Sequence, residues 1–172
     1  MMLETEARKK IYSFILSSPG SHLRDMGRRL NISLGHLRYH LDQLERNDRI
    51  VSRKDGYYRR YFATRSLDPA LESTLCALRK KTTRRILLHL LNVPGATNTD
   101  IAATINLRPA TVSLYLKELV EREVIERTRD GRESRYNIKD EQRFVYALKN
   151  YKLSFFNGLV DAALEIYKES HV

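Results

Sequence analysis

Apolar residues recur every three or four positions in several short segments of the chain, a spacing typical of helices with one buried face. In the first third of the chain these stripes predict three helices, over residues 7–17, 23–30 and 34–47. Ser33 precedes the third helix and suits its N-cap position. Leu37, Leu41 and Leu44 form one stripe of that helix, so we expect them in the core.

After residue 47 the pattern becomes typical of strands. Residues 50–53 and 57–63 predict two short strands, and Lys54-Asp55-Gly56 predicts the turn between them. An Asp-Gly pair between strands is a strong hairpin signal. Tyr61 and Phe62 are expected to pack inward. Three helices followed by a β-hairpin is the order of a winged helix-turn-helix domain.

The whole pattern occurs twice, because residues 19–63 reappear without a gap 75 positions later as residues 94–138. The turn pairs Pro19-Gly20 and Asp55-Gly56 return as Pro94-Gly95 and Asp130-Gly131. A single long period of this kind indicates a duplicated domain. The second copy predicts helices over 83–92, 99–105 and 109–122, with Pro109 in the first turn of the last, and a second hairpin. The predicted fold is therefore mainly α, with small β-hairpin wings and two tandem winged helix-turn-helix domains.

Two further segments lie outside the repeat. Asp68 and Pro69 suit the N-cap and first turn of a linking helix. From residue 140 a wide apolar stripe predicts C-terminal helices, which Gly158 bends or breaks. We predict four parts: a first domain over 1–66, a linking helix over 67–81, a second domain over 82–139 and a helical tail over 140–172.

The apolar stripe of the tail must be buried, either against the two domains or against the tail of a second chain. Symmetric pairing is the commonest oligomer, and it suits palindromic DNA sites, so we favour a homodimer through the tail. The stripe consists of Phe144, Val145, Leu148, Tyr151, Phe155, Leu159, Ala163 and Ile166.

The net charge of the chain and its distribution indicate the kind of partner that the protein binds. The 172 residues carry a formal net charge of +10, and the excess of basic residues lies in the repeats, since the tail is nearly neutral. This favours a polyanion as partner. The single cysteine, Cys76, excludes an intrachain disulfide. We find no signal peptide or membrane-spanning segment and predict a cytoplasmic protein without membrane attachment.

Enzyme chemistry is not expected, because no nucleophile with its base, phosphate loop or pair of carboxylates stands out. His36 and His40 lie four residues apart, like a metal-binding pair. His40 borders the core stripe, however, and no thiol or carboxylate cluster accompanies it, so we favour a structural role. We predict no cofactor and no metal. The chain has no third domain for a large pocket, so any small ligand would have to lie between helices.

The segments "SLGHLRYHLDQLERNDRI" and "RPATVSLYLKELVEREVI" resemble the recognition helix of winged-helix transcription regulators of the broad ArsR/MarR-like group. The closest likeness is to archaeal tandem winged-helix regulators, and it covers residues 7–63 and 83–138. The resemblance implies a DNA-binding regulator. Members often have a glycine before the first wing strand, where this chain has Asp48 and Glu123. Asn47-Asp48 can supply a left-handed residue, and Arg122-Glu123 does so less readily.

Recognition helices of this kind enter the major groove, and their N-terminal halves contact base edges. Arg38 can bind guanine through two hydrogen bonds, and Gly35 allows close approach of the backbone. The predicted contacts of the first domain are Ser33, Gly35, His36, Arg38 and Tyr39 from the helix, with Arg53, Lys54, Tyr57 and Arg59 from the wing. Arg60 and its equivalent Arg135 fit a phosphate contact and a structural ion pair equally well.

The equivalent surface of the second domain is a weaker candidate. Leu114 stands where the first copy has Tyr39, and it suits either a thymine methyl group or a protein partner. The predicted contacts are Arg108, Thr111, Ser113 and Lys117 from the helix, with Arg129 and Arg132 from the wing. A basic run, Arg79-Lys80-Lys81 with Arg84-Arg85, suits either a phosphate-facing patch or ordinary solvated surface.

These observations favour a sequence-specific regulator that binds double-stranded DNA as a dimer in the nucleoid, with the transcription machinery as a further partner. Two other classes stay open. Tandem winged helices also serve as protein-interaction scaffolds, and the same basic residues would suit a chromatin architectural protein that tolerates any sequence.

Overall fold

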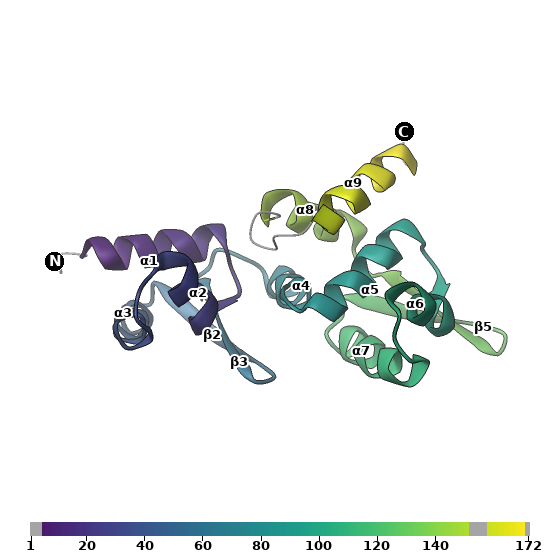
Figure 1. Ribbon diagram of the computed structural model, residues 1–172, viewed down its shortest axis with the longest axis horizontal. Helices are drawn as coiled ribbons and strands as arrows, with labels where there is room; N and C mark the ends of the chain where they lie inside the picture. Colours follow the sequence, from purple (N-terminus) through teal and green to yellow (C-terminus); the bar gives the residue numbers. More distant parts are fainter. Residues whose placement is uncertain (1–4, 152–157, 171–172) are drawn as a thin grey trace. The chain divides into compact units, whose positions relative to one another are not determined.

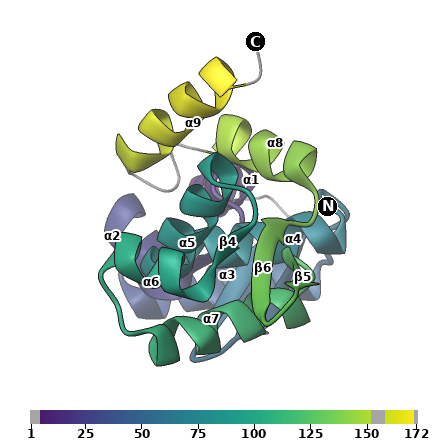
Figure 2. The same ribbon diagram turned by 90° about the vertical axis from the view of Figure 1, so that its right-hand side faces the viewer.

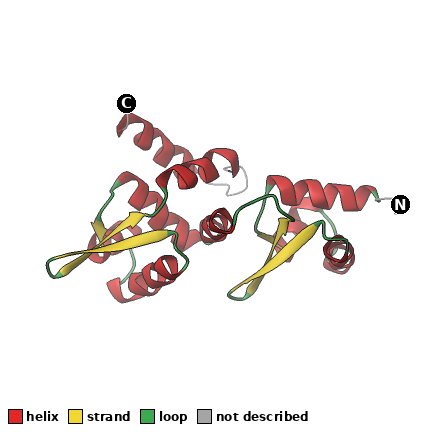
Figure 3. Ribbon diagram, turned by 180° about the vertical axis from the view of Figure 1, so that it is seen from behind, coloured by secondary structure: helices red, strands yellow, loops and turns green. Residues whose placement is uncertain are grey.

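The computed structural model describes residues 5–151 and 158–170, and its chain divides into two units, Met1–Glu72 and Ser73–Val172 (Figure 1). Each unit contains one domain of three helices with a three-stranded antiparallel sheet, and further helices lie outside these two domains (Figure 3). The mainly helical fold with two tandem helix-turn-helix domains is confirmed. The finer division into four parts stays a prediction.

The first unit has the predicted order of elements. β1 pairs with β3, and β3 with β2, so the sheet order is β1-β3-β2. The elements are α1 (Glu6–Ser17), β1 (Ser21–His22), α2 (Leu23–Leu30), α3 (Leu34–Arg46), β2 (Ile50–Asp55) and β3 (Tyr58–Ala63). Leu37, Leu41 and Leu44 are buried against Ile11 and Ile15 of α1, as their stripe predicts.

The corner between α2 and α3 is tight. Asn31 ends α2 in the left-handed conformation (φ 54°), and Ser33 caps α3 by accepting a hydrogen bond from the His36 backbone N–H at 3.4 Å. A Cβ atom on Gly27 would lie 2.9 Å from Leu34 Cδ2 and 3.2 Å from the Ile32 carbonyl oxygen. Glycine at this position therefore lets the corner pack closely against α2.

The first hairpin differs from the prediction in one respect. Asp55 was expected in the turn, but it is the last residue of β2, and the turn consists of Gly56 and Tyr57. The reason is that Asp55 is only 2% exposed and forms an ion pair with Arg60 of β3, which holds its side chain under the sheet. Tyr57 consequently lies at the tip of the wing and not in the strand.

The second unit repeats this arrangement with the sheet order β4-β6-β5. Its elements are α5 (Lys81–Asn92), β4 (Ala96–Thr97), α6 (Asn98–Ile105), α7 (Pro109–Glu121), β5 (Ile125–Asp130) and β6 (Glu133–Ile138). Pro109 is the first residue of α7, as predicted. Glu123 takes the left-handed conformation (φ 57°) just as Asp48 does (φ 52°), although its side chain suits that conformation less well.

The linking helix α4 (Pro69–Arg79) begins as predicted, since the Asp68 carboxylate accepts hydrogen bonds from the backbone N–H groups of Ala70 and Leu71 at 3.0 Å. Arg84 and Lys80, two members of the adjoining basic run, make contacts inside the second unit. Arg84 is 9% exposed, because its guanidinium donates to the Leu78 carbonyl at 2.8 Å, and burial lowers its pKa.

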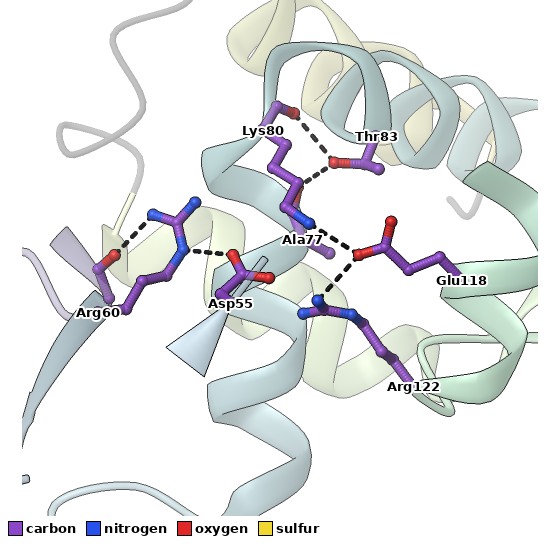
Figure 4. Close-up of polar contacts among 8 residues, drawn as sticks. Asp55, Arg60, Ala77, Lys80, Thr83, Glu118 and Arg122 are labelled. Carbon is purple, nitrogen blue, oxygen red and sulfur yellow. Dashed lines mark hydrogen bonds and ion pairs between the residues drawn. The ribbon is translucent and has the colours of Figure 1, made fainter. Parts of the chain in front are cut away.

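Lys80 is also used inside the second unit. Its ammonium donates to Glu118 of α7 at 2.7 Å, and Arg122 pairs with the same carboxylate oxygen at 2.9 Å (Figure 4). Thr83 bonds to the carbonyl oxygens of Ala77 and Lys80 (Figure 4). These contacts stabilise the junction of α4 with α5 and hold α7 beside it.

The tail contains α8 (Glu141–Tyr151) and α9 (Gly158–Ser170), and α9 packs on α5 (Figure 2). Four members of the predicted stripe, Phe144, Val145, Leu148 and Ala163, are buried within the unit, whereas Ile166 is 48% exposed. Phe155 and the side chain of Leu159 lie outside the described residues. Most of the described stripe therefore packs on its own unit. No helix within the described ranges is long and apolar enough to cross a membrane.

Candidate nucleic-acid interface

A groove of about 450 Å³ lies in the first unit between the start of α2, the helix α3 and the wing. Its walls are largely aromatic or charged: His22, Leu23, Arg24, Arg38, Asp42, Tyr57, Tyr58, Arg59 and Tyr61. Three predicted contacts, Arg38, Tyr57 and Arg59, thus meet around one hollow. A helix and a wing that flank a groove in this way can together follow the backbone and base edges of a duplex.

Arg38 is exposed and makes no hydrogen bond or ion pair with any described residue. Its guanidinium is therefore available to a ligand. Arg24, at the first turn of α2, is likewise exposed and lines the same groove. Asp42, one turn after Arg38, adds a negative charge to the wall of this groove.

The remaining predicted residues of α3 lie outside the groove. Ser33, Gly35, His36 and Tyr39 are exposed along the N-terminal half of α3. A Cβ atom on Gly35 would meet nothing within 4 Å, so the fold itself does not require glycine there. This leaves that side of the helix open to close approach by a partner.

The two histidines of α3 contact each other, with 3.0 Å between their Nε2 atoms. His40 is buried, and its pKa is lowered, chiefly by burial and then by the charges of His36 and Arg8. A neutral, structural His40 agrees with this arrangement. Within the part of the chain that the structure describes, no three His, Cys, Asp or Glu side chains are grouped to hold a metal ion.

The first wing presents an aromatic and basic edge. Tyr57 at its tip is 87% exposed, and Tyr58 stacks on His22 with 4.5 Å between ring centroids. Arg59 donates to Glu45 and Ser52, each at 2.7 Å, so its guanidinium is already paired with a carboxylate of the same domain.

Of the two other wing cations that were predicted to contact DNA, Arg53 pairs with Glu72 at 3.3 Å. Lys54 makes no hydrogen bond or ion pair with a described residue and is exposed. Lys54 is therefore the wing cation most available for a phosphate.

Arg60 has a structural role, which resolves the two interpretations left open by the sequence. Its side chain is 3% exposed, and it joins Asp55 at 2.5 Å and the Gly20 carbonyl at 2.9 Å (Figure 4). Arg135 makes the same two contacts in the second unit, to Asp130 at 2.8 Å and to the Gly95 carbonyl at 3.2 Å. Both arginines tie the wing to the start of the sheet.

The second unit has an equivalent groove of about 650 Å³ with different walls. Small or oppositely charged residues replace the aromatic and basic ones, among them Thr97, Thr99, Ser113, Lys117, Glu121, Glu133 and Ser134. Ser113, at the position of Arg38, accepts a hydrogen bond from the Asn98 amide at 2.5 Å. Lys117 lies 3.9 Å from Glu121.

Lys117 and Arg127 line this groove, and further cations of the second unit lie outside its lining. Arg129 and Arg132 in the wing and Arg108 before α7 are exposed, and none of the three pairs with a described residue. Thr111 is half-buried, and Leu114 is 70% exposed on the outer face of α7. This surface suits phosphate contacts better than base contacts.

The sequence patterns did not single out His22, Arg24 and Tyr58, which the fold adds to the first groove. All three become neighbours of Arg38 only through the pairing of β1 with β3, which depends on contacts about 40 residues apart. His22, Leu23 and Arg24 lie at the start of α2, directly before the recognition helix in the sequence. The basic residues at this helix start were the one sequence signal that could have indicated their part in the groove.

Two family models match the chain. Residues 5–74 match one described as an N-terminal HTH domain, and residues 79–126 match one described as winged helix-turn-helix DNA-binding. The chain is also homologous to an uncharacterised HTH-type transcriptional regulator of Methanocaldococcus jannaschii, with 32% identity over 143 residues. That alignment covers 81% of this chain and 35% of the relative, so the chain spans about a third of the relative's length.

Solved structures give weaker matches. The AntR antimony-specific transcriptional repressor aligns over 57% of this chain and 77% of its own, with 24% identity and a TM-score of 0.40. Lactococcus lactis ZitR in complex with DNA aligns over 50% of this chain and 58% of its own, with 26% identity and a TM-score of 0.32. TM-scores this low support no functional conclusion.

Proposed function

We propose that this chain, with its two helix-turn-helix domains homologous to those of an archaeal regulator, is a transcription regulator that binds double-stranded DNA sequence-specifically. The first unit is the main reader of bases in this proposal. The observation that carries it is the unpaired guanidinium of Arg38, held beside Arg24 and Tyr57 in the groove between α3 and the wing.

Arginine in the N-terminal half of a recognition helix is suited to guanine, whose O6 and N7 accept two parallel hydrogen bonds. In this proposal Arg24, in the wall of the groove, and Lys54, exposed in the wing, bind the phosphates that fix the register. Gly35 and Tyr39, on the outer face of α3, complete the surface that enters the major groove.

The second unit anchors the complex in this proposal. Arg108, Arg129 and Arg132 bind phosphates, and Thr111, Ser113 and Lys117 contribute weaker polar contacts. The exposed Leu114 contacts either a thymine methyl group or another protein. A component of the transcription machinery is one such partner.

Homodimerisation through the tail and residence in the nucleoid belong to the proposal. The exposed Ile166 and Tyr146 are the tail side chains open to a second chain. We expect Ile166→Asp to convert a dimer to a monomer in light scattering while the far-ultraviolet circular dichroism is unchanged. A wild-type protein that is monomeric at micromolar concentration would remove the dimer from the proposal.

The test of the main proposal is selection of bound duplexes from a random DNA pool at near-physiological salt. We expect a reproducible enriched motif, and an inverted repeat if the protein binds as a dimer. Retention of DNA without enrichment would instead favour an architectural protein, because phosphate contacts alone give affinity without sequence preference. No retention would favour a protein-interaction scaffold. The proposal includes no catalytic activity.

A further inference from the structure

A second hollow lies in the second unit, away from its groove, and is lined by residues of α5, α6 and the C-terminal helix α9. Its volume is about 410 Å³, within the range of about 300–1,000 Å³ typical of pockets for small molecules. The walls are mainly apolar and include Leu88, Ile105, Ala163 and Ile166.

Three polar groups in this hollow lack partners. The His89 Nε2 and Asn92 Oδ1 atoms are buried and accept or donate no hydrogen bond among the described residues. Arg85 lines the same hollow and pairs with no described residue. Burial lowers the pKa of His89 against the opposing effect of Asp100, so the ring is neutral at pH 7. Buried polar atoms without partners are costly, and a bound ligand would satisfy them.

The hollow is not a general property of the repeated domain. The first copy has Phe14 in place of His89, and the guanidinium of Arg29 lies over the Phe14 ring, 6.0 Å from its centroid. The second copy has Thr104 in place of that arginine. At these two positions an aromatic ring and an arginine of the first copy are replaced by a histidine and a threonine in the second, the copy that α9 covers.

We propose that this hollow binds a small organic acid with a flat apolar body, whose carboxylate pairs with Arg85 and whose hydrogen-bond donor reaches Asn92 Oδ1. The apolar walls bury the body of the ligand, since desolvation of apolar surface supplies most of the affinity of such sites. The amide oxygen of Asn92 can only accept, which selects a ligand that carries an N–H or O–H group at the end remote from its charge.

The position of the hollow gives the ligand an effect on the recognition helix. Thr104 and Ile105 are the last residues of α6, and the corner Asn106-Leu107 connects them directly to α7. A ligand that joins α9 to the end of α6 would stabilise one placement of α7. This consequence rests on the proposed DNA binding, whereas the ligand site does not.

Indole-3-acetate is a suitable probe, because it combines a carboxylate, a flat ring and an N–H donor. The chain contains no tryptophan, so excitation at the long-wavelength edge of indole absorption, where its tyrosines absorb little, reports the probe. We expect the full chain, without DNA, to bind indole-3-acetate with a Kd below roughly 1 mM. 1-Methylindole-3-acetate, without the donor, and indole-3-ethanol, without the charge, should each bind at least about tenfold more weakly.

Two variants and one control complete the experiment. Arg85→Gln should weaken indole-3-acetate at least about tenfold, and His89→Phe, which installs the residue of the first copy, should abolish binding by filling the hollow. Lys10→Gln removes the equivalent cation from the first copy and should leave binding unchanged. Urea unfolding of each variant verifies that it is folded.

Three results would overturn the site. The first is no binding of any of the three probes at about 10 mM. The second is equal binding by wild type, Arg85→Gln and His89→Phe, which would place the probe elsewhere. The third is a lower molecular mass of these variants together with no probe binding by wild type, which would assign the hollow to an interface between two copies of the chain. Each measurement is made without DNA. A failure of the ligand proposal is therefore distinguishable from a failure of the proposed DNA binding.

Discussion

The two grooves lie at equivalent positions of the same repeated fold, but their chemistry differs. The first is walled by arginines and tyrosines around Arg38, whereas the second has Thr99 and Ser113 in place of Arg24 and Arg38. Residues that build the domain are shared, such as Arg60 with Arg135 and Asn31 with Asn106. After duplication, the fold was preserved and the surface that meets a partner diverged.

The shared arginines themselves lie in different surroundings. Arg60 is covered by Tyr58, whose ring centroid is 5.4 Å from the guanidinium carbon, and its side chain is 3% exposed. The second copy has Glu133 in place of Tyr58, and the side chain of Arg135 is 42% exposed. The same pair of hydrogen bonds is thus buried in one domain and open to solvent in the other.

The largest expected effect follows from this difference. Arg60→Ala removes the cation paired with the buried Asp55 carboxylate and the donor to the Gly20 carbonyl, so we expect the free energy of unfolding to fall by about 3–5 kcal/mol. Arg135→Ala exposes its partners to water, and the change should be much smaller because solvent screens an exposed pair.

Urea unfolding of the two variants measures both values. If the chain unfolds in two steps, one for each domain, the loss in Arg60→Ala should fall on only one step. Similar losses in Arg60→Ala and Arg135→Ala would show that burial of the pair does not matter, contrary to the comparison.

The second prediction concerns DNA. Arg38→Ala should weaken binding to the selected duplex by about 1–3 kcal/mol and relax the preference at one base pair. Ser113→Ala, at the same position in the second copy, should change the affinity little. Both are measured by fluorescence anisotropy on the selected duplex and on a scrambled one.

Lys10→Ala controls for the loss of one positive charge, since Lys10 lies exposed on α1, away from the groove. An equal loss for Arg38→Ala on both duplexes would reject base reading by Arg38. A larger loss for Ser113→Ala than for Arg38→Ala would exchange the roles of the two domains.

Local signals in the sequence were sufficient for most of the fold. The helices end within about two residues of their predicted ends, because the stripes, caps and turn residues are local. Asp55 was placed in the turn for the same reason, since an Asp-Gly pair is a local signal. Its inward position depends on Arg60, which reaches it only across the finished hairpin.

The candidate site was predicted only in part, because a sequence pattern gives the face of a helix but not the neighbours of that face. Arg38 was expected to face outward, and it does. The hydrogen bonds of Arg59 to Glu45 and Ser52 join α3 to both wing strands. The spacing of these residues in the sequence does not predict such bonds. The partnerless His89 and Asn92 likewise depend on how α9 lies over α5.

The third prediction compares the buried histidines of the two units. Burial lowers the pKa of both His40 and His89, so the unfolded chain takes up protons at a higher pH than the folded one. Stability present above about pH 6.5, the ordinary pKa of histidine, is therefore lost as the pH falls below it. For one group the slope cannot exceed about 1.4 kcal/mol per pH unit.

His40→Gln should reduce this slope, measured as the change in unfolding free energy between pH 7.5 and pH 5. His89→Gln should reduce it in the same direction, and the double variant should reduce it further, since the two groups lie in different units. A slope unchanged by either substitution would mean that carboxylates alone cause the acid sensitivity.

The smallest expected effect is on the salt dependence of DNA binding, and it tests the phosphate contacts of the two wings separately from the recognition helix. Lys54 and Arg129 occupy equivalent positions in β2 and β5, both exposed and both without a described partner. Each bound phosphate contributes roughly 0.9 to the slope of log affinity against log salt concentration. Lys54→Ala and Arg129→Ala should therefore each lower the salt slope by about one while they weaken selected and scrambled duplexes alike. If only Lys54→Ala lowers the slope, the second wing does not touch DNA, and the second domain would be an assembly element that presents Leu114 to a protein partner.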